Sequence, residues 1–390
     1  MTLTTLDIIL IIITVAIAAA MIVILLRRKK FVVKTARRFD DKYSALLQES
    51  ESEVRRLKLI NDQLNKNSAA KKSPSASSSG ESSPGINLER FAMEQKKLEV
   101  QQQELFDRNK QLWNMSVSIE KERQHIQQLK SEIEAQHRSV MSSIQYAKLI
   151  QNAVLPSKEI LKESFDDVFL FWRPRDIVSG DYYWMKRIGD TVIFTVADCT
   201  GHGVPGAFMS MLGVAFLNEI CVEFNGETHP AQILEQMRSK VITTLRQTND
   251  PLEQKDGMDM GLCILNLATM KMQFAGANNG MYHVRGNTLT EYKAVKNPIA
   301  IYPKILPFVN HDVDIQHGDY VYMYSDGYAD QFGGDDRKFT SRRLRELLVS
   351  INSQTKVAAE QAELLNSTFD EWRGKREQMD DVLIGGYCIR

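Results

Sequence analysis

A seven-residue repeat between residues 91 and 147 restricts the fold of this chain more than any other feature of the sequence. Apolar residues recur there at intervals of seven: Phe91, Leu98, Leu105, Leu112, Ile119, Ile126, Ile133, Val140 and Ala147. Such a sustained repeat is typical of a supercoiled helix pair, and the β-branched residues in its second half favour a parallel pair. The second seam is mostly polar, as at Gln101, Glu122 and Gln136, so we expect weak pairing. The alternative is one long helix that packs on a globular domain.

The segments before this helix predict a membrane anchor. Ile8 to Leu26 is an uncharged apolar run, about the length needed to cross a bilayer, and Arg27 to Lys30 follow it. The positive-inside rule then predicts a single-pass protein of the cytoplasmic (inner) membrane, with its N-terminus outside and the rest of the chain in the cytoplasm. A cleaved signal peptide is the alternative, but its basic residues precede the apolar run, whereas here they follow it.

The remaining sequence divides by composition. A Ser- and Lys-rich stretch around residues 67–86 cannot bury a core and predicts a disordered linker. The expected organisation is an anchor at 1–30, a juxtamembrane coiled coil at 31–66, the linker at 67–86, a coiled coil and regulatory linker helix at 87–155, and a globular domain at 156–390.

Charge and cysteine content exclude several classes of function. Lys and Arg together number 49, as do Asp and Glu, so no net field attracts nucleic acid, and we expect no nucleic-acid partner. The cysteines at 199, 221, 263 and 388 form no CxxC pair. This spacing argues against a disulfide framework and a zinc site, and it fits a reducing compartment.

Acidic residues at the ends of β-like runs indicate a metal site in the C-terminal part. Asp181 precedes an aromatic run, Asp198 follows the apolar run 191–197, Asp326 follows the aromatic run 320–324, and Asp380-Asp381 opens the last apolar run. Each aspartate alone could serve as a cap or turn residue. Together, with almost no His or Cys beside them, they suit hard divalent cations such as Mg²⁺ or Mn²⁺.

These motifs, in this order, resemble the metal-dependent protein phosphatases (PPM, or protein phosphatase 2C superfamily), in the bacterial SpoIIE/RsbU-like branch. The matching motifs are Gly180-Asp181, Asp198-x-x-Gly201-His202-Gly203, Ser325-Asp326-Gly327 and Asp380-Asp381. The resemblance covers roughly residues 160–390. Beyond Pro156, strand-like runs joined by short turns predict mostly antiparallel sheets with outer helices, an α+β fold. The resemblance implies the PPM-type αββα sandwich of two packed sheets.

The resemblance also implies residue roles. Two divalent cations, Mn²⁺ or Mg²⁺, would be bridged by Asp198, with the backbone carbonyl of Cys199 as a direct or outer ligand. Asp326 and Asp380 would hold one ion and Asp181 the other. Asp381 is the alternative to Asp380. Asp198 and Asp326 would then be the catalytic residues.

Three other polar groups near the motifs have less specific interpretations. Arg173 and Arg175 are the nearest candidates to bind a substrate phosphate, although they could equally be solvated arginines beside a proline turn. His202 is interpreted as a loop histidine bonded to backbone, without a catalytic role. Asn278-Asn279-Gly280 is typical of a hairpin turn, with substrate binding as a weaker option.

The function that the resemblance implies is hydrolysis of phosphoserine or phosphothreonine on a signalling protein, such as an anti-sigma-factor antagonist, by two-metal activation of water. The seven-residue repeat further predicts a parallel homodimer whose pairing regulates the enzyme through the linker helix. One alternative is a non-catalytic membrane scaffold with a phosphatase-like binding domain. Another is a phosphatase that acts on a small phosphate ester.

Overall fold

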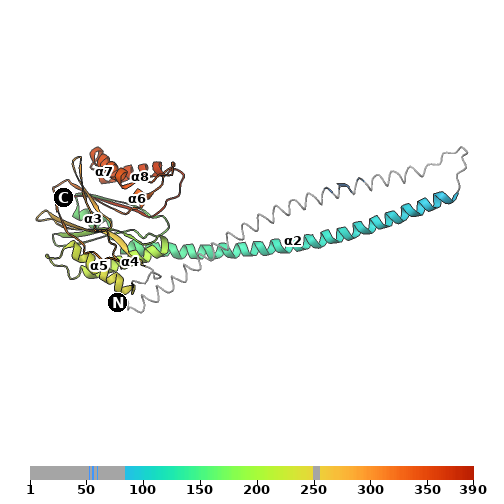
Figure 1. Ribbon diagram of the computed structural model, residues 1–390, viewed down its shortest axis with the longest axis horizontal. Coiled ribbons are helices and arrows are strands. Elements are labelled where there is room, and N and C mark those ends of the chain that lie inside the picture. Colours follow the sequence, from blue (N-terminus) through green and yellow to red (C-terminus); the bar gives the residue numbers. More distant parts are fainter. Residues whose placement is uncertain (1–51, 53–54, 57–58, 60–83, 249–254) are drawn as a thin grey trace. The chain divides into compact units, whose positions relative to one another are not determined.

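The computed structural model describes residues 52, 55–56, 59, 84–248 and 255–390. The expected membrane anchor and most of the juxtamembrane coil and linker lie outside these residues. The internal contacts divide the chain into two units between residues 140 and 141. The expected long helix is confirmed as α2 (Pro84–Val154), which runs as one continuous helix in Figure 1. Its pairing with a second copy stays a prediction.

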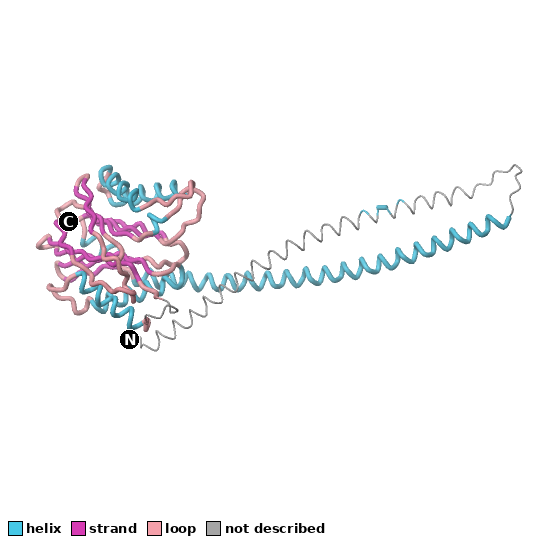
Figure 2. The backbone as a smooth tube through the Cα atoms, viewed as in Figure 1, coloured by secondary structure: helices cyan, strands magenta, loops and turns pink. Residues whose placement is uncertain are grey.

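The second unit contains two five-stranded antiparallel sheets, shown in magenta in Figure 2. One has the strand order β1-β10-β9-β6-β7, and the other has the order β2-β3-β4-β5-β8. The strands are β1 (Asp167–Arg173), β2 (Tyr182–Ile188), β3 (Thr191–Cys199), β4 (Met258–Asn266), β5 (Lys271–Ala277), β6 (Met281–Arg285), β7 (Thr288–Tyr292), β8 (His311–Asp314), β9 (Tyr320–Tyr324) and β10 (Val382–Cys388).

Helices cover the outer faces of both sheets, which confirms the αββα sandwich. In Figure 1, α4 and α5 lie on one side, and α7 and α8 lie on the other. The bounds are α3 (Lys158–Ser164), α4 (Gly203–Ile220), α5 (Pro230–Thr244), α6 (Gly327–Asp330), α7 (Ser341–Gln354) and α8 (Ala358–Arg373). Separate apolar clusters fill the space between the sheets and the space under each helical layer. Because β3 is buried on both faces, it reads as a continuous apolar run.

The apolar composition of α4 reflects this core position. It is the one helix among the described residues that is long and apolar enough to cross a membrane, and 56% of it is buried in the domain. Gly213 lets it approach the sheet, since a Cβ there would lie 2.2 Å from the Tyr182 hydroxyl. We therefore interpret α4 as a core helix.

Two strands, β7 and β8, were not expected from the sequence. The strands β7 and β8 are short and mostly exposed, so they lack the apolar signal of the buried strands. The second unit begins at Met141, earlier than the boundary expected at 156. The reason is that Gln151 and Leu155 are buried among the residues of the domain.

Candidate active site

Three aspartates lie side by side at one edge of the sheet that contains β3. Asp198, near the end of β3, pairs directly with Asp259 of β4. Asp181 immediately precedes β2, next to the pair that Tyr182 forms with Ala197 of β3. Because these backbone positions are adjacent in the register, the three residues share one edge. Asp259 was not expected from the sequence.

The other sheet brings two more acidic positions to this cluster. Asp326 follows β9 and occupies the N-cap position of α6, and Asp380 lies just before β10, the neighbour of β9. Repulsion from Asp326, Asp259 and Asp380 contributes, after burial, to a pKa of the Asp198 carboxyl well above its usual range. The acidic groups of the two sheets are therefore within electrostatic reach of one another.

Ser325 connects the two sheets at this point. Its hydroxyl donates to Asp181 Oδ2 at 2.5 Å and accepts a hydrogen bond from the Leu383 N–H at 2.9 Å. Ser325 and Asp181 are both almost completely buried. The Asp181 carboxylate is thus oriented by a residue from the opposite sheet.

The final acidic pair divides into a buried and an exposed carboxylate. Asp381 is buried, and its oxygens accept hydrogen bonds from the N–H groups of Arg175 and Gly180, each at 2.7 Å. Asp380 is exposed, and its Oδ1 accepts from the Asp381 N–H at 2.9 Å. Asp381 therefore holds the loop before Asp181, whereas Asp380 is exposed and its charge adds to burial in raising the pKa of Asp198 and Asp326.

Two glycines allow the backbone around Asp181 and the turn after Asp198 to pack together. A Cβ on Gly206 would lie 2.1 Å from the carbonyl oxygen of Gly201, and a Cβ on Gly180 would lie 2.6 Å from the same atom. Side chains at either position would push the two segments apart. The small residues of these motifs therefore set the distance between the acidic loops.

Burial and mutual repulsion disfavour the ionised form of the carboxyl groups in this cluster. Burial, followed by the Asp198 charge, raises the pKa of Asp181 well above its usual range. Burial, then Asp330 and Asp380, raises the pKa of Asp326 to about 6, although its outer face is exposed. A bound cation would offset the repulsion between these carboxylates and favour their ionised form.

The donor set fits hydrated hard cations better than a closed protein cage. Within residues 84–248 and 255–390, no three His, Cys, Asp or Glu side chains already surround a point that could hold a metal ion. Mg²⁺ keeps several water ligands and usually binds one or two carboxylates directly. The aspartate carboxylates at the strand ends of the two sheets are compatible with that mode of binding.

The arginines considered as phosphate ligands have protein partners. Arg173 Nη1 pairs with Asp370 Oδ1 at 2.8 Å, and its guanidinium lies over the Phe369 ring, 5.3 Å from the centroid. Arg175 Nη1 donates to the Met379 carbonyl at 2.7 Å. These contacts hold α8 and the segment before β10.

Two other residues of the central motif have defined environments. The His202 ring does not bond to backbone as interpreted from the sequence, because its Nδ1 lies 2.7 Å from Asp176 Oδ2 on an exposed surface. Cys199 is buried, and burial raises the pKa of its thiol well above the usual range. Hard cations such as Mg²⁺ prefer oxygen ligands, so the backbone carbonyl of Cys199 stays its expected metal ligand.

The Asn278 turn lies beside Asp259 and is not a hairpin, because it joins β5 of one sheet to β6 of the other. Asn278 has a φ of 56°, as an Asn turn permits, and its Nδ2 donates to Asp259 Oδ1 at 2.8 Å. Lys296 Nζ donates to the Asn278 carbonyl at 3.1 Å. The charged residue within the apolar segment Met258-Asp259-Met260 is the sequence signal that could have identified this part of the site.

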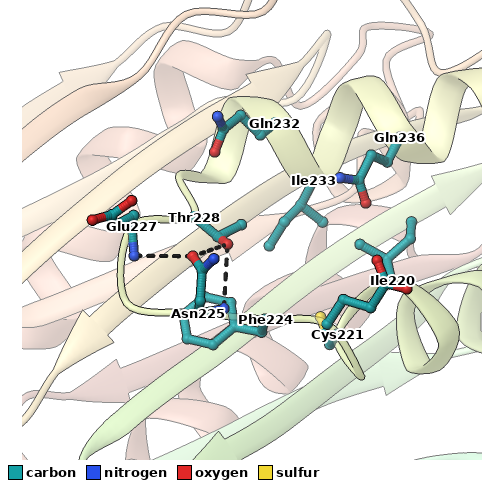
Figure 3. Close-up of a pocket in the computed structure, with 10 residues that line it drawn as sticks. Ile220, Cys221, Phe224, Asn225, Glu227, Thr228, Gln232, Ile233 and Gln236 are labelled. Carbon is teal, nitrogen blue, oxygen red and sulfur yellow. Dashed lines mark hydrogen bonds between the residues drawn. The ribbon is translucent and has the colours of Figure 1, made fainter.

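A pocket of about 370 Å³ lies at the opposite end of α4 (Figure 3). It is lined by residues of the α4–α5 connection, including Glu223, Asn225 and Glu227. Since α4 has 18 residues, its two ends are about 27 Å apart. This pocket is therefore separate from the acidic cluster at the start of the helix.

Known proteins match the same part of the chain. Residues 188–386 match the family model described as Stage II sporulation protein E (SpoIIE). The solved SiaA-PP2C domain of Pseudomonas aeruginosa is 32% identical, with a TM-score of 0.59, and the match covers 66% of this chain and 99% of that domain.

A curated relative also matches part of the chain. Phosphoserine phosphatase RsbU of Bacillus subtilis (strain 168) is 25% identical over 201 residues, which cover 49% of this chain and 54% of RsbU. The match thus spans about half the length of that relative. With its SpoIIE-matching segment and its two-sheet sandwich, the chain belongs to the SpoIIE family and carries a PP2C-type phosphatase domain.

Proposed function

We propose that this chain is a metal-dependent protein serine/threonine phosphatase. The observation that supports this function best is the convergence of Asp181, Asp198, Asp326 and Asp380 from four strand ends of two sheets. A scaffold would gain nothing from clustered carboxylates that repel one another. The similarity to RsbU, whose name describes a phosphoserine phosphatase, favours the same substrate class here.

The proposed metal ligands are Asp198 for both ions, Asp326 and Asp380 for one and Asp181 for the other, with the Cys199 carbonyl beside them. Asp380 is preferred to Asp381 because the Asp381 oxygens already accept two backbone hydrogen bonds. Bound Mn²⁺ or Mg²⁺ would supply a water of lowered pKa and neutralise charge on a phosphoryl group. The protein itself would orient the carboxylates, as Ser325 does for Asp181.

Metal removal tests this proposal. The purified chain should hydrolyse a chromogenic phosphate ester and a phosphoserine peptide with Mn²⁺ or Mg²⁺, and hydrolysis should stop in excess chelator. It should return when either metal is added back, because the carboxylates remain in place. Turnover that persists undiminished in chelator would contradict a metal-dependent mechanism.

The proposed substrate is a phosphorylated signalling protein, with an anti-sigma-factor antagonist as the specific candidate. The open position of Asp326 and Asp380 at the sheet edge would admit a phosphorylated side chain presented by a protein. A comparison of kcat/KM for the phosphoserine peptide and for the small phosphate ester separates this substrate class from a small-molecule phosphatase.

We further propose membrane anchoring through residues 8–26. The chain should stay with the membrane fraction after an alkaline carbonate wash, and deletion of residues 8–26 should release it, because the apolar run supplies the anchor. Deletion of residues 67–83 is the control and should leave it membrane-bound. Sedimentation without residues 8–26, or digestion of the phosphatase domain by protease outside intact cells, would contradict this topology.

Regulation is proposed to pass through the C-terminal end of α2. Gln151 is buried, and its Nε2 donates to the Ser179 carbonyl at 2.6 Å and to Ser210 Oγ at 2.8 Å. The Ser179 N–H donates back to Gln151 Oε1 at 3.2 Å. Since Ser179 lies two residues before Asp181, pairing of α2 in a homodimer could act on the acidic cluster through this glutamine.

A further inference from the structure

The acidic cluster continues into a polar chain that ends at an exposed lysine. Asp259, beside Asp198, accepts the hydrogen bond from Asn278 Nδ2, and the carbonyl of Asn278 accepts one from Lys296 Nζ. The positive charge of Lys296 lowers the pKa of Asp259, against the larger effect of burial. The ammonium is therefore close enough to act on the charges at this edge of the sheet.

The backbone that carries Lys296 is fixed against the sheet. The Val295 N–H donates to the Gly276 carbonyl at 3.0 Å, and the Asn278 N–H donates to the Val295 carbonyl at 2.9 Å. The Asn297 N–H also donates to the Val295 carbonyl, at 2.8 Å. Lys296 thus extends from a segment tied to the end of β5, and its position beside Asn278 does not depend on a free loop.

The charge of Lys296 is less compensated than that of the other lysine near the cluster. The charge of Lys338 lowers the pKa of Asp326, against the larger effect of burial, but its Nζ forms an ion pair with Asp330 Oδ2 at 2.6 Å. Lys296 binds a neutral carbonyl oxygen, and within residues 84–248 and 255–390 it has no carboxylate within ion-pair distance. Its ammonium can therefore accept an anionic partner without first breaking an ion pair.

A charge-assisted contact from a protein cation would strengthen the binding of a phosphate dianion at this acidic edge, in addition to bound metal. Arg173 cannot supply it without leaving Asp370, and Arg175 is directed to the Met379 carbonyl. An ammonium binds phosphate as a point charge and needs no planar two-point geometry. Of these side chains, Lys296 has the available charge and the position beside Asp259.

We propose that Lys296 binds the phosphate group of the substrate, with Asn278 holding the ammonium beside the acidic cluster. The inference rests on the proposed phosphatase function and adds a substrate-positioning residue to it. Asn278 would then have two roles, because its side chain orients Asp259 while its carbonyl orients Lys296.

Kinetics with the Mn²⁺-loaded full chain and a phosphoserine peptide test the role of Lys296. Lys296→Met should raise KM and the concentration of inorganic phosphate that inhibits by half, each about tenfold, because one charge-assisted contact is lost. The value of kcat should change by less than about threefold, since a positioning contact serves the bound substrate and the transition state alike. Lys296→Arg should restore most of the affinity.

The matched control is Lys304→Met, which removes another exposed lysine from the same connection between β7 and β8. It should leave KM and phosphate inhibition unchanged. If Lys296→Met also leaves both unchanged, or lowers kcat alone, Lys296 does not bind phosphate. Failure of Lys296→Arg to improve on Lys296→Met would likewise overturn the inference.

Calorimetric titration with inorganic phosphate separates this inference from the proposed function, because it requires no turnover. Phosphate binding that weakens about tenfold in Lys296→Met, in a chain that hydrolyses no phosphoserine peptide, would retain the phosphate site and contradict the proposed phosphatase. Turnover with phosphate binding that is independent of Lys296 would contradict the inference alone.

Discussion

Asp198→Ala should abolish metal-dependent hydrolysis and leave the activity at the level seen in excess chelator. Asp198 occupies the centre of the cluster, since its carboxyl is acted on by Asp326, Asp259 and Asp380 from both sheets. Loss of its oxygens would remove the one ligand proposed to contact both cations. Asp198→Asn should have the same effect, because it keeps the size of the side chain and loses the charge.

Asp198→Asn should also stabilise the metal-free protein. A carboxyl whose pKa is raised in the folded state disfavours folding at any pH above its unfolded value of about 4. The pKa of Asp198 is raised well above that value, so removal of the charge at neutral pH should increase the Tm of metal-free Asp198→Asn. A catalytic residue that carries this cost without metal is typical of a site built for a bound cation.

Metal addition should reverse the order of stability. At a metal concentration of about 100 times Kd, binding adds about 2.7 kcal/mol to the free energy of unfolding of the wild type. The Asp198 variants should gain much less. Asp190→Ala, in the exposed turn between β2 and β3, is the control and should behave as the wild type in activity and in metal-induced stabilisation.

Differential scanning calorimetry and the phosphopeptide assay measure these effects together. Full activity in Asp198→Ala would exclude the proposed metal site. A wild type that Mn²⁺ and Mg²⁺ neither activate nor stabilise would support the scaffold interpretation.

The sequence predicts the acidic cluster because its residues lie at strand ends, where local pattern is informative. Asp181, Asp198 and Asp326 each border a β-like run that the structure confirms. Asp259 could not be placed in this way, because its role depends on the register that pairs β4 with β3. Register is a tertiary property, and a lone charge in an apolar strand gives only an indirect signal of it.

Side-chain partners far apart in the sequence were also inaccessible to pattern analysis. Arg173 meets Asp370 and His202 meets Asp176 through packing of separate segments, so residue type alone suggested phosphate binding for the first and a backbone contact for the second. The proposed preference for Asp380 over Asp381 rests on the two backbone hydrogen bonds that Asp381 accepts, which the sequence does not reveal. The apolar run at 8–26 lies outside the described residues, so its role stays a prediction.

Gln151→Ala should reduce turnover about tenfold or more and weaken activation by Mn²⁺, although Gln151 belongs to α2 and not to the acidic motifs. Its amide satisfies the N–H and the carbonyl of Ser179, and the Ser179 hydroxyl accepts from the Asp181 N–H at 3.1 Å. A shift of about 1 Å in a positioned group can lower a rate by as much as a hundredfold. Loss of the hydrogen bonds between Gln151 and Ser179 would allow such a shift of Asp181.

The variant should also be less stable, because the buried Ser179 N–H would lose its partner at a cost of about 1–3 kcal/mol, whereas the Ser179 carbonyl would keep the hydrogen bond from Ser210 Oγ at 3.4 Å. Stability alone therefore cannot identify a regulatory role. Gln151→Met keeps the volume and removes the hydrogen bonds, whereas Gln145→Ala truncates an exposed glutamine of the same helix. We expect Gln151→Met to resemble Gln151→Ala in activity, and Gln145→Ala to resemble the wild type.

Activity measurements at decreasing protein concentration distinguish a regulatory role of Gln151 from a purely structural one. The mostly polar second seam of α2 predicts weak pairing, so the specific activity of the wild type should change with protein concentration as the proposed dimer dissociates. If the signal from pairing reaches Asp181 through Gln151, that dependence should disappear in Gln151→Ala and Gln151→Met and persist in Gln145→Ala. Sedimentation velocity at the same concentrations would establish that dimerisation itself is unchanged. Should the Gln151 variants keep both the Mn²⁺ activation constant and the concentration dependence of the wild type, the glutamine serves only to fasten the helix, and regulation through this contact is wrong.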